Sequence, residues 1–218
     1  MFELVKSVFL SVCLMMSSVC HAGPVQYTER AAYATRGAAV IYHTNPLGQR
    51  SVVGSGWATK EGGDYKLITA QHVAFGPGPG ILEFCSYKDE CVVVSQFEGV
   101  GPVISTGLPQ DWIYWEVDRL PKGLRASKIG SAPVVGEEIC AAGAPYGRAG
   151  EVTCGAVTND VGPLFYMDAR ILPGNSGGPV YDDDGCVIGM VLAIDRNPAT
   201  GEPVENSALA LEVDQIWL

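Results

Sequence analysis

One serine of this sequence lies in a segment that could make it a nucleophile. Residues 174–179 read GNSGGP, so glycines stand two positions before Ser176 and directly after it. Glycines allow a tight turn that exposes the hydroxyl and aims backbone N–H groups at a nearby oxyanion. The segment therefore indicates nucleophilic catalysis by Ser176, provided that a base lies beside it. A Gly/Ser turn without chemistry is the alternative.

The base for such a serine would be a histidine, and the sequence has three. His21 lies in the N-terminal apolar segment, and His43 lies inside a stretch that reads as an ordinary strand. His72 ends an apolar strand where the chain turns into a Gly/Pro loop, so it could reach across a cleft, and we expect it to be the base. No histidine follows Ser176, which excludes the α/β-hydrolases, whose G-x-S-x-G motif precedes the acid and the histidine.

A carboxylate must hold the imidazole in the right tautomer and stabilise its charged form, which requires an acid that is largely buried. Asp111 opens the strongly apolar run DWIYW. Three other aspartates between the histidine and the serine lie in a turn or at polar strand ends: Asp89, Asp118 and Asp160. We expect Asp111 to be the acid, with the capping of a turn as its alternative role.

These side chains need a scaffold, and the sequence predicts an all-β one. Short β-branched and aromatic runs recur between Gly, Pro, Asn and Asp, with almost no helical periodicity. The expected strands are 38–44, 51–59, 65–69, 81–87, 91–97, 112–117, 138–142, 151–158, 164–169, 179–181, 186–194 and 207–213. The polar stretch 118–132 divides them into two sets of six.

Two halves of this size suggest two six-stranded Greek-key barrels, about 38–117 and 133–218, with the site in the cleft between them. Barrels of this kind close their edges and leave no exposed strand. A tandem of immunoglobulin-like domains is the alternative, and it would require no particular placement of Ser, His and Asp.

The first 22 residues read as an export signal. Lys6 precedes the apolar run 8–20, and the small-residue sequence CHA at 20–22 is a cleavage site. A buried N-terminal helix is the alternative. We expect a mature chain, residues 23–218, that is secreted or periplasmic and has no stable membrane insertion after cleavage.

The charge of the chain argues against two classes of partner. The 218 residues include 24 acidic and 14 basic ones, a net charge of −10, and removal of the signal takes away one of each. Nucleic acids and anionic lipids bind proteins through clustered Lys and Arg. We therefore expect neither as a partner.

Several segments together resemble the trypsin-like serine peptidases, in particular the HtrA-type protease domain. Residues 54–57, GSGW, and 67–73, LITAQHV, look like the strand pair that carries the histidine in that family, and the run that begins at Asp111 looks like its Asp strand. Residues 167–180 resemble the HtrA-type nucleophile segment, and 187–194 the strand after it. The His-Asp-Ser order is that of chymotrypsin.

The resemblance spans about residues 38–213 and departs from the family in one respect. HtrA-type proteins usually carry PDZ domains after the protease domain, whereas only 42 residues follow Ser176. That length is enough to finish a second barrel. We therefore expect a protease domain without a PDZ domain, and we do not carry over the chaperone-like or gated behaviour of that branch.

The resemblance implies a serine endopeptidase that cleaves protein or peptide substrates through an acyl-enzyme and requires no cofactor. It also implies that the backbone N–H groups of Gly174 and Ser176 form the oxyanion hole, with a structural role for Asn175. The alternatives are a non-catalytic peptide-binding module on a protease scaffold and a viral or phage processing protease with an N-terminal membrane anchor. The oligomeric state is left open.

The resemblance further implies a pocket for the residue before the cleaved bond. Arg170, six positions before the nucleophile, occupies the position of the pocket floor, and Ile171, Ala193 and Ile194 occupy wall positions. Shallow apolar walls favour cleavage after small or medium aliphatic residues such as Val or Ala. An inward-facing Arg170 would instead favour cleavage after Glu or Asp.

The cysteines suggest disulfides rather than a metal site. Cys85 and Cys91 bracket one turn symmetrically, and Cys140 and Cys154 bracket another, so each pair could form a disulfide across a hairpin of an exported protein. Cys186 is left over and is expected to be a buried free thiol. No Cys-x-x-Cys or His-x-x-x-His spacing suggests zinc, and the sequence DDDG at 182–185 reads as an acidic hairpin turn rather than a calcium loop.

Overall fold

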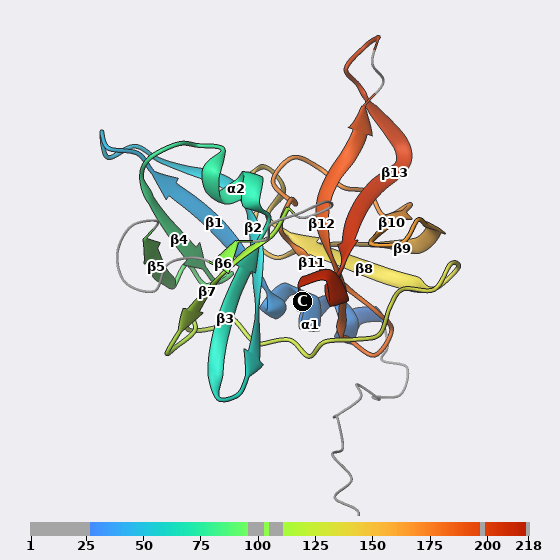
Figure 1. The fold of residues 1–218 in the computed structure, drawn as a ribbon, viewed down its shortest axis with the longest axis horizontal. Coiled ribbons are helices and arrows are strands. Elements are labelled where there is room, and N and C mark those ends of the chain that lie inside the picture. The colour runs from blue at the N-terminus through green and yellow to red at the C-terminus, as the bar shows by residue number, and fades with distance from the viewer. Residues whose placement is uncertain (1–26, 96–102, 105–110, 197–198, 217–218) are drawn as a thin grey trace, which may run out of the picture.

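Two β-sheets lie side by side and make up most of the protein (Figure 1). The structure is a computed structural model that describes residues 27–95, 103–104, 111–196 and 199–216. The expected export signal and its cleavage site lie outside these residues. The all-β class expected from the sequence is confirmed.

The first sheet has seven antiparallel strands in the order β5-β4-β1-β2-β3-β7-β6. Their bounds are β1 Ala38–Thr44, β2 Arg50–Glu61, β3 Asp64–Thr69, β4 Ile81–Cys85, β5 Cys91–Ser95, β6 Val103–Ile104 and β7 Ile113–Val117. Large apolar side chains from its central strands are fully buried and fill its interior, among them Trp57, Leu67, Phe84 and Ile113. Burial of such side chains away from water is the main stabilising contribution to the sheet.

The second sheet closes into a six-stranded barrel in the order β10-β13-β12-β11-β8-β9. Its strands are β8 Glu138–Gly143, β9 Glu151–Asp160, β10 Leu164–Met167, β11 Pro179–Tyr181, β12 Val187–Arg196 and β13 Pro203–Glu212. A second apolar cluster fills this barrel and includes Ile139, Phe165, Met167 and Val191. In Figure 1 the hairpin of β12 and β13 projects beyond the rest of the molecule.

Two features of the fold differ from the expectation. All twelve expected strands are present, but the short strand β6 joins the first sheet, and within the described part of the chain this sheet is open rather than a closed six-stranded barrel. The sequence also gave no sign of helix α1, Tyr27–Gly37. Small residues such as Ala34 form its buried face, so it lacks the apolar stripe by which a packed helix is recognised.

The segment between the sheets contacts both of them. Ser127 forms a parallel bridge with Thr59 of β2, and Ile129 forms one with Val187 of β12. The hydroxyls of Ser127 and Tyr181 are 3.0 Å apart, and burial raises the pKa of Tyr181 to about 12. This connection therefore fixes the first sheet against the second barrel.

Disulfides join the two expected cysteine pairs. Cys85–Cys91 and Cys140–Cys154 each link residues that face one another directly on neighbouring strands. Cys186 is also disulfide-bonded, so the expectation of a free thiol is wrong. Symmetry about a turn reveals only pairs within one hairpin, and Cys186 has no such partner.

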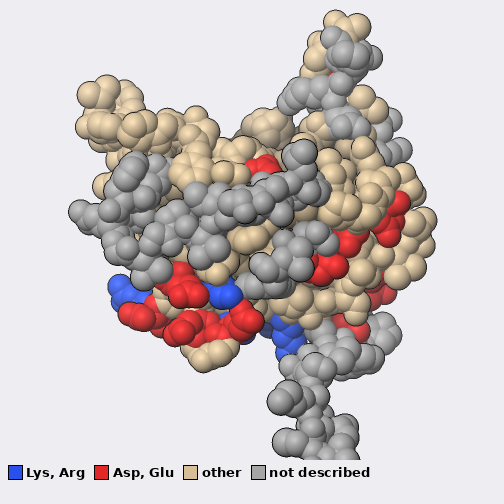
Figure 2. Space-filling model, in the orientation of Figure 1, with Lys and Arg blue, Asp and Glu red and all other residues tan. Residues whose placement is uncertain are grey.

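Where charged side chains gather on the face drawn in Figure 2, most of them are acidic. Figure 2 shows acidic side chains gathered at the lower end of the first sheet, with few Lys or Arg side chains on this face. Among the residues that the structure describes, no helix is long and apolar enough to cross a membrane.

One acidic side chain lies inside the second barrel wall. Glu212, at the end of β13, is only 6% exposed. Burial, together with the neighbouring carboxylates of Asp214 and Asp160, raises its pKa to about 7. The folded state therefore holds the proton of Glu212 more tightly than the unfolded chain does.

This difference predicts a pH-dependent effect of Glu212→Gln on stability. Below pH 4.5 the carboxyl is protonated in both states; between there and about pH 7 the unfolded chain ionises first, so the folded state is increasingly disfavoured. The amide cannot ionise, so the variant should gain melting temperature over the wild type at pH 8 but not at pH 4.5. Exposed Glu90→Gln is the control, and an equal effect of Glu212→Gln at both pH values would contradict the prediction.

Candidate active site

Ser176 lies in the loop between β10 and β11, and this loop rests on the first sheet. The backbone N–H of Ser55, on β2, donates a hydrogen bond to the carbonyl of Ser176 over 2.8 Å. The side chain of Ser176 is partly exposed, whereas that of Asn175 beside it is buried. The loop therefore presents the serine at the junction of the two sheets.

Every backbone carbonyl from Pro173 to Ser176 accepts a hydrogen bond. The carbonyl of Pro173 accepts the N–H of Tyr146 over 2.9 Å, and that of Gly174 accepts the hydroxyl of Ser55 over 2.6 Å. The carbonyl of Asn175 accepts the N–H of Gly178 over 2.9 Å, and that of Ser176 accepts the N–H of Ser55 over 2.8 Å. The carbonyl and the N–H of a trans peptide point in opposite directions. These bonds therefore also fix the direction of each N–H in the loop.

The N–H groups of the loop alternate in what they contact. Those of Asn175 and Gly177 donate to other backbone carbonyls over 3.0 and 2.7 Å. Those of Gly174 and Ser176 donate to no other residue in the described ranges. Two N–H groups thus remain available beside the serine hydroxyl, which is the arrangement that binds an oxyanion.

Two glycines are required by this loop. Gly174 has a φ of +104°, and a Cβ there would lie 2.5 Å from the carbonyl oxygen of Ala144. Gly177 has a φ of +82°, and a Cβ there would lie 2.2 Å from the hydroxyl of Thr69 and 2.3 Å from the carbonyl oxygen of Ser55. Only glycine combines this backbone conformation with so close an approach to Ala144, in the case of Gly174, or to the first sheet, in the case of Gly177.

Strand pairing brings His72 to Asp111. Strands β3 and β7 are neighbours with Thr69 opposite Ile113, so the residues just beyond these ends also meet, and the N–H of Gln71 donates to the carbonyl of Asp111 over 3.2 Å. His72 lies in the short helix α2, Gln71–Phe75, rather than at the strand end expected from the sequence.

The carboxylate of Asp111 holds His72 at two points. One oxygen accepts the backbone N–H of His72 over 2.9 Å, and the other contacts Nδ1 of the ring. With Nδ1 as the donor, Nε2 is left as the acceptor. The Asp111 side chain is 33% exposed, more than the largely buried acid that we expected, and that of His72 is 49% exposed.

One cavity of about 550 Å³ joins these groups. His72, Asp111, Gly174 and Ser176 all line it. Its remaining lining is apolar and comprises Ile171, Leu172, Pro173, Leu192, Ala193, Ile194 and Leu209. The structure therefore brings together three residues from two sheets with the apolar wall positions expected from the sequence.

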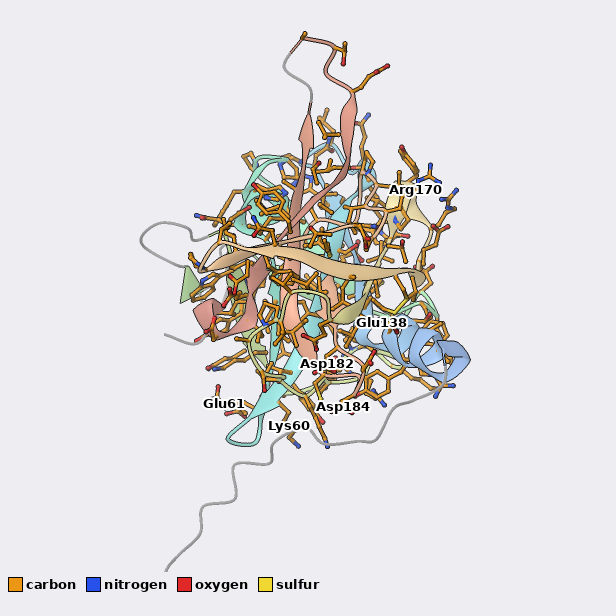
Figure 3. All side chains as sticks on the ribbon, turned by 90° about the vertical axis from the view of Figure 1, so that its right-hand side faces the viewer. Lys60, Glu61, Glu138, Arg170, Asp182 and Asp184 are labelled. Atoms are coloured by element: carbon orange, nitrogen blue, oxygen red, sulfur yellow. A yellow bond between two sulfur atoms is a disulfide. The ribbon has the colours of Figure 1, made fainter. Side chains whose placement is uncertain are left out.

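Arg170 lies apart from this cavity. It is exposed and lines two other cavities, of about 670 and 170 Å³. The larger one shares Ile171, Leu172 and Ile194 with the cavity of His72. Figure 3 shows Arg170 at the outer edge of the second barrel, so its guanidinium does not contribute to the lining beside Ser176.

The other candidate groups of the sequence have structural surroundings. His43 is buried on β1 opposite Ser51 and Leu82 and does not line the cavity of His72. The acidic residues at 182–184 form a tight hairpin turn, in which the N–H of Cys186 donates to the Asp182 carboxylate over 2.8 Å. Within the described chain, the only geometric metal-site candidate contains both cysteines of the Cys85–Cys91 disulfide and is not a credible metal site.

One functional candidate was missed at the level of sequence. Ser55 supplies two of the four donors that hold the nucleophile loop, yet it is 119 residues away from Gly174 along the chain. The only feature of the sequence that marks Ser55 is its position between Gly54 and Gly56. These residues lie in a segment that resembles a family motif, but the motif itself contains no catalytic residue.

Comparisons with known proteins identify relatives of this chain. A profile of the trypsin-like peptidase domain matches residues 54–190. A relative from Marinomonas sp. (strain MWYL1), named a probable periplasmic serine endoprotease DegP-like, is 30% identical over 153 residues, which are 66% of this chain and 30% of that protein. A protein of the same name from Bartonella henselae is 41% identical over 68 residues, 28% of this chain and 14% of the relative.

Solved structures show the same fold. A serine endoprotease from Yersinia pestis has a TM-score of 0.67 at 21% identity, covering 89% of this chain and 65% of its own. The HtrA-type protease AlgW with a decapeptide has a TM-score of 0.65 at 21% identity, covering 87% and 65%. This chain thus spans about a third or less of the curated relatives and about two thirds of the solved chains.

The close approach of Gly177 predicts a large loss of stability for Gly177→Ala. The added Cβ would combine an unfavourable φ with overlap against Thr69 and Ser55, a cost of about 2–5 kcal/mol. Gly62→Ala is the matched control, because Gly62 also has a positive φ, +60°, but nothing lies within 4 Å of a Cβ there. Urea denaturation measures the free energy of unfolding of both variants. Equal losses of stability would show that the overlap with Thr69 and Ser55 contributes nothing.

Proposed function

This chain belongs to the trypsin-like peptidase domain family, and we propose that it is a serine endopeptidase with Ser176, His72 and Asp111 as its catalytic triad. One observation supports this most directly: all three side chains line one cavity, although they come from two sheets. The two-point contact between Asp111 and His72 further supports the assignment.

In the proposed mechanism Asp111 keeps the proton of His72 on Nδ1, so that Nε2 accepts the proton of the Ser176 hydroxyl. The serine oxygen attacks the carbonyl carbon of a peptide bond and forms a tetrahedral intermediate. His72 then gives its proton to the departing amine, which leaves an acyl-enzyme. Water, deprotonated by His72 in the same way, releases the acid and restores Ser176. This chemistry requires no cofactor.

The backbone N–H groups of Gly174 and Ser176 would bind the negative oxygen of the intermediate. Both lack another acceptor among the described residues, and both adjoin the serine hydroxyl. Donors that are already oriented stabilise developing charge without reorganisation, and the loss of one typically lowers kcat about 10²- to 10³-fold. Asn175, whose side chain is buried, would have a structural role in the same turn.

A peptide substrate would pair with β12 as an added strand of the sheet. β12 pairs with β11 only up to Met190, so Ala193 and Ile194 pair on one side alone, with β13, within the described residues. Main-chain hydrogen bonds to such an edge bind a peptide without regard to its sequence. The apolar wall beside Ser176, with Ile171, Ala193 and Ile194, would then select the residue before the cleaved bond.

The setting of the reaction follows from the relatives and from the charge. The curated relatives are named as probable periplasmic proteases, and the disulfides suit an oxidising compartment. We therefore place the chain in the periplasm or outside the cell, with proteins or peptides as substrates. The net charge of −10 disfavours nucleic acid as a partner.

Removal of either the nucleophile or the base should abolish hydrolysis. Ser176→Ala and His72→Ala are each expected to lower kcat/KM on a peptide substrate by at least about 10⁴-fold without changing the fold. A fluorophosphonate probe should label the wild type at Ser176 only, as mapped by mass spectrometry. Ser131→Ala, a change at an exposed serine, should behave as the wild type, and substantial activity in purified Ser176→Ala would refute the assignment.

The cavity lining predicts a graded preference for small or medium aliphatic residues before the cleaved bond. One methylene in an apolar pocket changes discrimination by about 1–3 kcal/mol, so Val and Ala should be favoured without strict exclusion of their neighbours. Digestion of a peptide library, read by mass spectrometry, measures this preference. Dominant cleavage after Lys, Arg, Glu or Asp would show that the aliphatic assignment is wrong.

A further inference from the structure

Ser55 of the first sheet contacts the nucleophile loop of the second barrel with both its backbone and its side chain. Its N–H donates to the carbonyl of Ser176 over 2.8 Å, and its hydroxyl donates to the carbonyl of Gly174 over 2.6 Å. One residue thus holds the two carbonyls on either side of Asn175. No other residue in the described chain donates to more than one of the four loop carbonyls.

The hydroxyl of Ser55 both donates and accepts a hydrogen bond and lies in a fully buried position. It also accepts the backbone N–H of Ala144, over 2.9 Å. Ser55 and Ala144 are both fully buried, and a Cβ at Gly143 would lie only 2.8 Å from the hydroxyl oxygen. A group that took the place of this hydroxyl would therefore have to make the same two hydrogen bonds.

Ser55 is also connected to the strand that leads to the proposed base. The hydroxyl of Thr69, the last residue of β3, donates to the carbonyl of Ser55 over 2.7 Å. His72 follows Thr69 by three residues. Ser55 therefore lies between the strand before the base and the loop of the nucleophile, and it bonds to both.

The loop cannot hold its conformation through its own backbone preferences. Gly174 has a φ of +104°, and a glycine at such a position can adopt many other conformations at little cost. The hydrogen bond from Ser55 fixes the carbonyl of Gly174, while the N–H of Tyr146 fixes the carbonyl before it. The Tyr146 bond thus fixes the peptide that carries the N–H of Gly174, and the Ser55 bond fixes the next peptide, Gly174–Asn175, so the two bonds together hold the backbone on both sides of the Gly174 Cα.

We propose that Ser55 is a positioning residue for the oxyanion hole, whose hydroxyl holds the Gly174–Asn175 peptide between the two peptides that carry the N–H groups of Gly174 and Ser176. The proposal rests on the proposed function, because it assumes that Ser176 is the nucleophile. Ser55 does not touch the reacting atoms. It acts by holding the Gly174–Asn175 peptide, and its loss should affect the stabilisation of the intermediate more than the binding of substrate.

The test compares Ser55→Ala with the wild type by the rate and the end point of fluorophosphonate labelling. The rate of labelling depends on the oxyanion hole, whereas the end point counts the folded sites. We expect Ser55→Ala to reach the same end point with a rate constant about 10- to 100-fold lower, somewhat less than the loss of a direct oxyanion donor. With a peptide substrate, kcat should fall by a similar factor and KM should change less than about threefold.

Thr59→Val is the matched control. Thr59 lies on the same strand, is 4% exposed and donates from its hydroxyl to the carbonyl of Ser127 over 3.0 Å, so the variant also loses one buried hydrogen bond between segments. It does not touch the nucleophile loop. Its labelling rate should equal that of the wild type, even if its melting temperature falls as far as that of Ser55→Ala.

If Ser55→Ala does not fold, Ser55→Cys replaces it, because the thiol nearly keeps the volume but is a weak donor. Ser55→Cys should also label slowly to a full end point. A Ser55 variant that labels within about twofold of Thr59→Val would overturn the proposal. Absence of labelling at Ser176 in the wild type would instead overturn the proposed function, so the two failures are distinguishable.

Discussion

The arrangement of the site depends on the contact between β2 and the nucleophile loop. Ser55 bonds to this loop twice, and Gly177 fits against the first sheet because it has no side chain. Without this contact the second barrel could still close through its own strand pairs, but Ser176 would have no fixed position relative to His72. The junction between the sheets, rather than either sheet alone, therefore determines the geometry that we propose for catalysis.

The proposed base and acid, His72 and Asp111, are positioned by a different and more local constraint. The pairing of β3 with β7 places the two chain segments side by side, and the carboxylate of Asp111 then binds both the backbone and the ring of His72. The ring is thus held even though it is half exposed. Two hydrogen bonds restrict a side chain more than one does. A charged partner that makes two can therefore orient a side chain even at a solvent-accessible position.

Much of the fold could be predicted because alternating β-branched and aromatic runs mark strands whatever their partners are. All twelve strands were found, while β6 is too short to show alternation and α1 buries small residues. The pairing of Cys186 and the role of Ser55 could not be read in this way. The role of Ser55 depends on contacts between residues far apart in the chain, as Ser55 and Gly174 are, and no local pattern encodes such contacts.

The closure of the second barrel has a consequence for the order in which the protein acquires its reactivity. β13, the last strand, pairs with both β10 and β12, which flank the segment that carries Ser176. A chain that emerges from the ribosome exposes His72 and Asp111 early, but the loop of Ser176 has no completed barrel to support it until residues 203–212 have followed. The loop that carries Ser176 therefore gains its full support only when nearly the whole chain has been synthesised.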